Sequence, residues 1–126
     1  NHPFVLMMLD IDNFKQINDL YGHSRGDEVL RGVGQCFQKT IRDTDFISRI
    51  GGDEFAIILP ESDSEHAKLI KQKLNAALDD CDRKWSESFQ ELIISVSIGY
   101  ASFPYDSGNK ESLFEAADQA LYKEKV

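Results

Sequence analysis

Four carboxylate side chains stand in two places of the sequence where together they can hold a metal ion. Asp10 and Asp12 end a continuous apolar run, and Asp53 and Glu54 follow two glycines between two short apolar runs. If the first run is a central strand, its end lies beside the turn, and the carboxylates repel one another unless a cation neutralises them. Because no His or Cys adjoins either pair, these oxygen ligands favour Mg²⁺ or Mn²⁺ over zinc.

Each carboxylate pair also has a simpler interpretation as a solvated cap or turn, since Asp is a favoured capping residue. Gly51 and Gly52 favour the metal interpretation, because glycines let a bulky ligand approach the backbone closely. An EF-hand over residues 10–21 is excluded, since Lys15 stands where that loop requires glycine and Tyr21 where it requires glutamate.

The segment after Asp12 offers groups that bind phosphate. We expect a helix to start there, with the free backbone amides of Asn13, Phe14 and Lys15 forming a phosphate cradle. The Lys15 ammonium adds a positive charge, although a solvated surface lysine is the simpler interpretation of that side chain alone. Metal, helix N-terminus and lysine together predict a nucleoside triphosphate site.

The composition is that of a soluble globular domain. The chain has 126 residues, of which 41% are apolar and 29% charged, and a formal net charge of −8. That charge argues against nucleic acid polymers and anionic membranes as partners. No signal peptide and no membrane-spanning run is visible in the sequence. We therefore expect one cytoplasmic domain without membrane contact, cut from a longer multidomain protein that can itself be membrane-anchored.

The two cysteines, Cys36 and Cys81, form no CxxC pair and stand in no His/Cys cluster. We expect free thiols in a reducing cytoplasm, with a disulfide between them left open. Nothing in the sequence attaches a catalytic role to either.

Apolar periodicity and turn residues predict eight secondary-structure elements. The order is β-α-α-β-β-α-β-α, which indicates an α+β ferredoxin-like (palm-type) domain with a central antiparallel sheet flanked by helices, mainly on one side. Gly99 is expected to permit close packing. The predicted elements are a buried strand over 4–11, a helix over 13–22, a second helix capped by Ser24, a hairpin of DFISRI and EFAIIL, a third helix after a capping box of Ser62 and Glu65, a polar loop or hairpin arm over 79–91, a strand over 92–103 and a helix over 112–124.

Four segments together resemble the GGDEF domain of bacterial diguanylate cyclases. They span nearly the whole chain in the order and spacing of that family, which makes the resemblance highly specific. The resemblance implies an Mg²⁺-dependent nucleotidyltransferase that condenses two GTP into cyclic di-GMP and two pyrophosphates at the interface of a homodimer. The segments are DIDNFKQINDLYGHSRGD (10–27), RDTDFISRIGGDEF (42–55), SVSIGYA (95–101) and ADQALYKEK (117–125).

The resemblance also implies which residues hold the metal. Asp10 and Asp53 match the side chains that bind Mg²⁺ (or Mn²⁺), with the backbone carbonyl of Ile11 contributing. Glu54 matches the catalytic carboxylate beside them, as a metal ligand or a proton acceptor. Asp12 is expected to cap the helix or to support the metal ligands from behind.

Substrate-binding residues follow from the same match. Asn18 and Asp27 match the pair that reads guanine, since Asp accepts from N1–H and the exocyclic amine, a donor pair that adenine does not present. Asp27 can also close a capping box with Ser24. Lys15 and Lys125 match phosphate-binding lysines.

Arg42 and Asp45 form an RxxD string that is separated from Gly51 by five residues. Alone, such a string is usually a local ion pair. At this register it matches the inhibitory site of the family, where cyclic di-GMP binds and stops synthesis. An arginine suits phosphate or the Hoogsteen edge of guanine, and a nearby aspartate accepts from the N–H groups of the base.

Three other functions remain open from the sequence. One is a catalytically silent module that binds GTP or cyclic di-GMP, against which the intact Gly51–Phe55 motif argues. A second is a cyclase for another purine, against which Asp27 argues. A third is a structural domain with an acidic surface patch.

Overall fold

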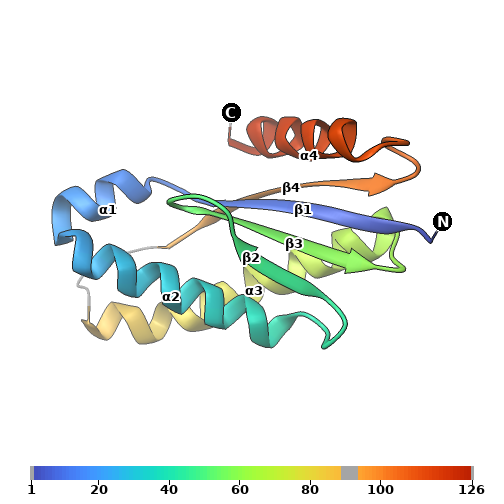
Figure 1. Cartoon of the computed structure of the whole chain (residues 1–126). Coiled ribbons are helices and arrows are strands. Elements are labelled where there is room, and N and C mark those ends of the chain that lie inside the picture. Colours follow the sequence, from blue (N-terminus) through green and yellow to red (C-terminus); the bar gives the residue numbers. More distant parts are fainter. Residues whose placement is uncertain (1, 89–93, 126) are drawn as a thin grey trace.

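The computed structural model describes residues 2–88 and 94–125, with the backbone alone described for 82–88. Its centre is one antiparallel sheet in the order β2-β3-β1-β4, so that the first strand lies between the third and the fourth (Figure 1). This arrangement confirms the expected ferredoxin-like α+β fold. The strands are β1 (Phe4–Ile11), β2 (Phe46–Arg49), β3 (Glu54–Pro60) and β4 (Val96–Phe103).

The apolar run of β1 explains its central place. Pairing to β3 on one side and to β4 on the other leaves no free edge, and an apolar core covers each face of β1. Val5, Met7 and Leu9 are fully buried on one face, and Met8 is 1% exposed on the other. Asp10 follows on the face of Met8 and is carried into the protein with it.

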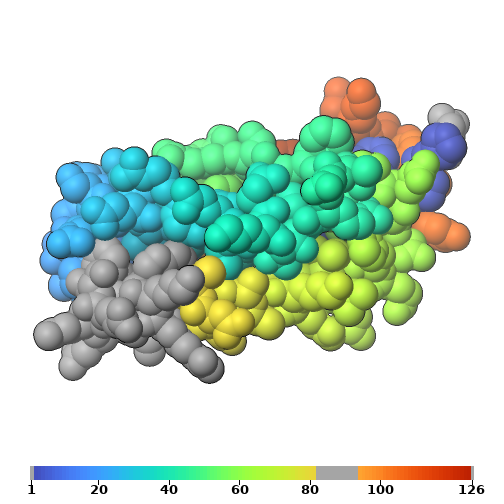
Figure 2. All heavy atoms as spheres, turned by 90° about the horizontal axis from the view of Figure 1, so that it is seen from below, coloured from blue at the N-terminus to red at the C-terminus, as the bar shows by residue number. Residues whose placement is uncertain are grey.

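Helices cover both faces of the sheet unequally, as expected. The larger apolar core lies between the sheet and α2 and α3, which lie side by side (Figure 2), and α1 extends it beyond the sheet. The smaller core lies under α4, on the opposite face. Its inward positions, Leu113, Ala117 and Leu121, are buried as the periodicity predicts. The helices are α1 (Phe14–Tyr21), α2 (His23–Thr40), α3 (Ser64–Ser88) and α4 (Lys110–Lys125).

Both predicted serine caps are wrong. Helix α2 begins already at His23, after Gly22 with φ 88°, and within the described ranges it has no side-chain cap, so Ser24 lies inside the helix. Helix α3 is capped by Asp63, whose Oδ1 accepts from the backbone N–H of His66 (2.9 Å). The two helices therefore begin at residues other than those that local cap statistics favour.

Two boundaries around the third helix also differ from expectation. The predicted loop over 79–91 is helical as far as Ser88, because it contains Lys, Arg and Glu, which have high helix propensity, and neither glycine nor proline interrupts it. Strand β4 begins at Val96 rather than at 92, and the remaining parts of these predictions, 89–93, lie outside the described residues. No described helix combines the length and the apolar character needed to cross a bilayer.

Gly99 allows α4 to approach β4, as predicted. A Cβ atom on Gly99 would lie 2.0 Å from the backbone nitrogen of Leu121 and 2.6 Å from the carbonyl carbon of Ala120. Such distances cannot be relieved by a side-chain rotation, because both neighbouring atoms belong to the backbone of α4. Gly99 therefore sets the position of the last turn of α4, which carries Lys125.

Replacing Gly99 by alanine is predicted to push α4 away from the sheet. We expect Gly99→Ala to lower the free energy of unfolding by roughly 3 kcal/mol, the upper part of the range for overpacking, as measured by urea denaturation. Gly108→Ala is the matched control, because a Cβ on Gly108 meets no atom within 4 Å. Equal stability of the two variants would contradict the close contact between β4 and α4.

Candidate active site

The end of β1 and the turn between β2 and β3 meet at one end of the sheet. Asp10 pairs in register with Glu54, and their side chains therefore project from the same face. The N–H of Ile11 donates to the carbonyl oxygen of Asp53 (3.1 Å), which ties the turn to β1. The fold thus brings Asp53 and Glu54, which follow the two glycines, to the end of β1 that carries Asp10.

The Asp10 carboxylate is buried and only half satisfied. The residue is 5% exposed, and its Oδ2 contacts the Nζ of Lys125 at the end of α4. Its Oδ1 is also buried and has no hydrogen-bond partner among the described residues. Buried carboxylate oxygens are normally hydrogen-bonded or bound to a cation, so this oxygen is a candidate metal ligand.

The electrostatics around Asp10 also favour a cation. Burial, and then the interaction with Asp10, raise the pKa of Asp53 to about 6. Burial by itself lowers the pKa of Lys125, but its contact with Asp10 and the charges of Asp10 and Asp53 outweigh this and raise it. Two carboxylates thus compete for one ammonium group, and a divalent cation would relieve their repulsion.

The oxygen ligands suit Mg²⁺, but the protein alone does not supply a full coordination shell. Asp10 and Asp53 offer hard oxygen ligands, and Ile11, whose backbone carbonyl is the third expected ligand, is the last residue of β1. Among the side chains that the structure describes (2–81 and 94–125), no three of His, Cys, Asp or Glu converge closely enough to hold a metal. This agrees with the usual behaviour of Mg²⁺, which takes one or two carboxylates and completes its shell with water and substrate phosphates.

Asp12 does not join the other carboxylates and does not cap α1, so the idea of four converging acids is wrong. Its Oδ2 accepts from the Oγ of Ser95 (2.8 Å) and its Oδ1 accepts from the Oγ of Ser97 (2.6 Å). No role was predicted for either serine from the sequence. The available signal was their i, i+2 spacing, which places both on the face of the strand opposite the larger core.

A polar cavity of about 380 Å³ lies where the start of α1 meets the end of α4. Asn13 precedes α1 in the left-handed conformation (φ 56°, ψ 33°), and within the described ranges its side chain makes no capping hydrogen bond. The first amides of α1 are therefore left for a ligand, as the phosphate-cradle prediction requires. Lys15 is exposed one position into this turn. The lining residues are Asp12, Asn13, Ser95, Ser97, Glu124 and Lys125.

Asn18 on α1 packs against Gly26 of α2, the residue before Asp27. A Cβ atom on Gly26 would lie 1.8 Å from Oδ1 of Asn18, so the Asn18 amide rests directly against the backbone of α2. Asp27 is the next residue and is exposed. The alternative capping box of Asp27 with Ser24 is wrong, because both residues lie inside α2.

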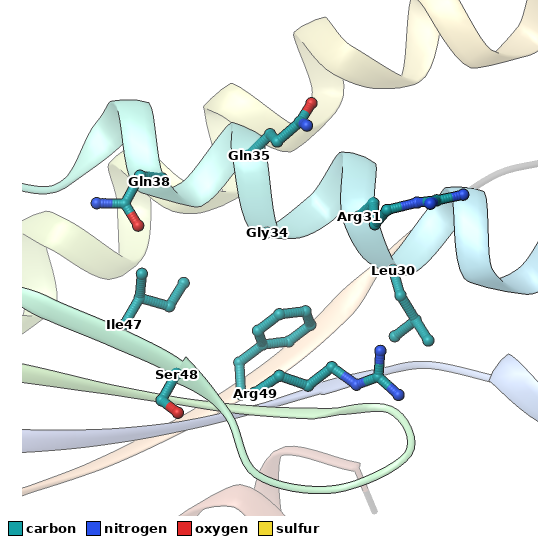
Figure 3. Close-up of a pocket in the computed structure, with 9 residues that line it drawn as sticks. Leu30, Arg31, Gly34, Gln35, Gln38, Ile47, Ser48 and Arg49 are labelled. Atoms are coloured by element: carbon teal, nitrogen blue, oxygen red, sulfur yellow. The ribbon is translucent and has the colours of Figure 1, made fainter.

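A groove of about 360 Å³ runs between α2 and the β2–β3 hairpin (Figure 3). Leu30 points from α2 toward Arg49 on β2, and Phe55 and Gly34 also line the groove. Neither Asp27, one helical turn before Leu30, nor Glu54, which projects from the opposite face to Phe55, lines this groove. The groove was not predicted from the sequence; a glycine inside a helix, Gly34, was the available signal.

The expected inhibitory pair forms a local ion pair at the other end of β3. Nε and Nη2 of Arg42 donate to Oδ1 of Asp45 (3.1 and 2.8 Å), and the backbone N–H of Arg42 donates to its Oδ2 (2.8 Å). Nη2 also donates to the carbonyl oxygen of Pro60 and to the Oγ of Ser62 (both 3.0 Å). The Asp45 carboxylate is fully buried, whereas 42% of the Arg42 side chain remains exposed.

Because the pKa of Asp53 is raised, replacing Asp53 should change the thermal stability by an amount that depends on pH. An acid whose pKa is higher in the folded state weakens the fold as the pH rises from 3.8 through about 6. In the absence of divalent cations, Asp53→Asn should therefore melt at a higher temperature than wild type at pH 7, and at nearly the same temperature at pH 4. Differential scanning fluorimetry with a chelator measures this. Asp79→Asn, on the exposed surface of α3, is the control, and an equal shift at both pH values would contradict the crowding of Asp10 and Asp53.

Solved structures repeat this fold. The GGDEF domain of PA1120 (YfiN or TpbB) from Pseudomonas aeruginosa is 30% identical, with a TM-score of 0.84 over 98% of this chain and 76% of that one. The GGDEF domain of DgcB from Caulobacter crescentus, solved in complex with c-di-GMP, is 33% identical, with a TM-score of 0.81 over 98% of this chain and 72% of that one.

Sequence comparison gives the same assignment. Diguanylate cyclase DgcP of Pseudomonas aeruginosa is 41% identical over 123 residues, which are 96% of this chain and 18% of DgcP. The chain spans at most about a third of the curated relatives that it matches first (34%, 18% and 26%). The family described as diguanylate cyclase, GGDEF domain, matches residues 1–126, and the chain therefore belongs to that family.

Proposed function

We propose that this domain is a diguanylate cyclase, which condenses two GTP molecules into cyclic di-GMP and releases two pyrophosphates. The observation that carries the proposal is the buried Asp10 carboxylate, whose Oδ1 has no partner among the described residues and which stands beside Asp53 and the first turn of α1. A cation and an anionic phosphate are the two ligands that these neighbouring groups accept. Family membership and the name of DgcP support the same reaction.

The residues take separate tasks along the bound nucleotide. The amides of Asn13, Phe14 and Lys15 and the ammonium groups of Lys15 and Lys125 hold the phosphates. Asn18 and Asp27 read the guanine edge, and Glu54 lies opposite Asp10 at the end of the sheet. Glu54 accepts the proton of the attacking 3′-hydroxyl.

Mg²⁺ is the cofactor in this proposal, with Mn²⁺ as a substitute. Asp10, Asp53 and the backbone carbonyl of Ile11 would hold it, with Glu54 as a further ligand. When bound, the metal polarises the phosphoryl oxygens and acidifies the attacking hydroxyl.

Catalysis requires two copies of the domain. Each site holds one GTP, and the 3′-hydroxyl of each nucleotide attacks the α-phosphate of the other, so one copy alone cannot close the ring. Dimerisation is therefore the step at which the remainder of a longer protein can control synthesis.

The activity test uses the full-length protein with GTP and Mg²⁺. We expect one cyclic di-GMP and two pyrophosphates per two GTP, and a loss of at least about 100-fold in Glu54→Gln, in line with the contribution of a general base. Glu111→Gln, in the first turn of α4, is the control and should keep wild-type activity. Failure to form any cyclic dinucleotide, or full activity of Glu54→Gln, would refute the assignment.

A catalytically silent GTP-binding module is the second candidate. It is favoured by one observation: the described residues do not bring three metal-ligating side chains together. The same assay separates the two functions, because a silent module binds GTP without turnover. ATP in competition with GTP tests the purine preference assigned to Asp27.

Gly26→Ala is predicted to weaken GTP binding selectively. The added methyl group displaces Oδ1 of Asn18, which lies 1.8 Å from the Cβ position, and so removes one guanine contact. We expect the Kd for GTP to rise by about tenfold, which corresponds to one hydrogen bond, with little effect on ATP. Titration calorimetry with non-hydrolysable analogues measures this, and Gly108→Ala is the control. An unchanged preference for GTP would exclude Asn18 from base recognition.

Product inhibition is assigned to Arg42 and Asp45, at the opposite end of β3 from Glu54. The exposed part of the Arg42 side chain is proposed to contact cyclic di-GMP. That the GGDEF domain of DgcB was solved in complex with c-di-GMP supports binding of this ligand by the domain. The double variant Arg42→Ala/Asp45→Asn removes both charges without leaving a buried carboxylate unpaired. We expect it to fold and bind GTP normally but to bind cyclic di-GMP at least about tenfold more weakly. Equal affinity of wild type and variant for cyclic di-GMP would rule out this site.

A further inference from the structure

Two thiols that the proposed reaction does not use meet between α2 and α3. Both Cys36 on α2 and Cys81 on α3 are free, as expected, and their Sγ atoms lie 2.6 Å apart. Cys81 donates to the sulfur of Cys36, and Cys36 donates to the carbonyl oxygen of Ala77 (3.2 Å). The two helices that carry them lie side by side on the lower face of the molecule (Figure 2).

The thiol pair opens to solvent on one side. A cleft of about 310 Å³ between the two helices is lined by both cysteines and flanked by Lys39 and Asp80. Cys36 is only 6% exposed, whereas Cys81 is half-buried. A small molecule in the cleft therefore reaches Cys81 before Cys36.

The surroundings favour oxidation over metal binding. A stable site for a soft metal ion needs three or four ligands, and within the described ranges no three His, Cys, Asp or Glu side chains form such a group. The sulfur atoms are separated by little more than the length of a disulfide bond, about 2.05 Å. Since they come from two packed helices, a bond between them joins elements that already touch.

We propose that Cys36 and Cys81 form a modification site, at which a low-molecular-weight disulfide oxidises the two thiols to one disulfide bond between α2 and α3. The thiolate of Cys81 attacks one sulfur of the oxidant and expels its first thiol, which leaves a mixed disulfide on Cys81. The sulfur of Cys36 then loses its proton, attacks Sγ of Cys81 and expels the second thiol. Two protein thiols and one disulfide oxidant thus give one protein disulfide and two small thiols.

The order of attack follows from the two environments. Burial, and then the contact with Cys81, raise the pKa of Cys36 to about 12, so that Cys36 stays protonated and is a poor first nucleophile. Once Cys81 carries the oxidant, Cys36 is the only described thiol in contact with it. The resulting bond closes the segment 36–81 into a loop, which contains β2, β3 and the catalytic turn. Closing this loop restricts the unfolded chain and stabilises the fold.

The test treats the reduced protein with oxidised glutathione and measures its intact mass under denaturing conditions. Wild type should lose two hydrogens, about 2 Da, and retain no glutathione. Its peptide map should contain Cys36 linked to Cys81 within one chain, and dithiothreitol should reverse the change. The oxidised protein should melt several degrees higher than the reduced one, whereas Cys36→Ser/Cys81→Ser should show no difference.

Single variants test the order of attack. Cys36→Ser should keep one glutathione on Cys81, because no second thiol is present to expel it. Cys81→Ser should stay mostly unmodified, because Cys36 is buried. The proposal is overturned if wild type stops at the mixed disulfide, if it forms disulfide-linked dimers instead, or if neither thiol reacts.

Discussion

The buried carboxylate of Asp10 must be balanced by positive charge, and the surrounding elements are arranged to provide it. A charged group that is 5% exposed needs a counter-charge, and the ammonium of Lys125 supplies it. The central position of β1 buries Asp10, and Gly99 brings α4 close enough for Lys125 to reach it. The backbone bond from Ile11 to Asp53 then adds a second carboxylate, so that the single lysine leaves negative charge uncompensated. In the proposed function, a divalent cation offsets this remaining negative charge.

The same sheet separates two sites that would otherwise interfere. Glu54 begins β3 and Pro60 ends it, so the proposed catalytic and inhibitory sites lie a strand length apart, about 20 Å. At the far end, Arg42 is held by Asp45, Pro60 and Ser62, which fixes its guanidinium while leaving part of it exposed. A ligand there does not meet the nucleotide of the same domain, and its effect would act through the packing of two domains.

What could be predicted from the sequence depended on strong local or periodic signals. The apolar run of β1, the Gly-Gly turn and the inward stripe of α4 each describe a single element, and each was correct. Predictions failed where a polar side chain found a partner far away in the chain. Ser62 accepts a hydrogen bond from Arg42 instead of capping a helix. Asp12 accepts hydrogen bonds from serines more than eighty residues later in the chain. The contact between Cys36 and Cys81 depends on helix packing in the same way, and no spacing rule reveals it.

The most direct test is a Mn²⁺ titration in the presence of a non-hydrolysable GTP analogue, followed by the relaxation rate of water protons. Wild type and Asp12→Asn should both show saturable binding, because Asp12 is directed toward Ser95 and Ser97. Asp10→Asn should show none, because an amide lacks the negative charge of the buried carboxylate and is a weaker ligand for a divalent cation. Undiminished binding by Asp10→Asn, or its loss in Asp12→Asn alone, would contradict the account.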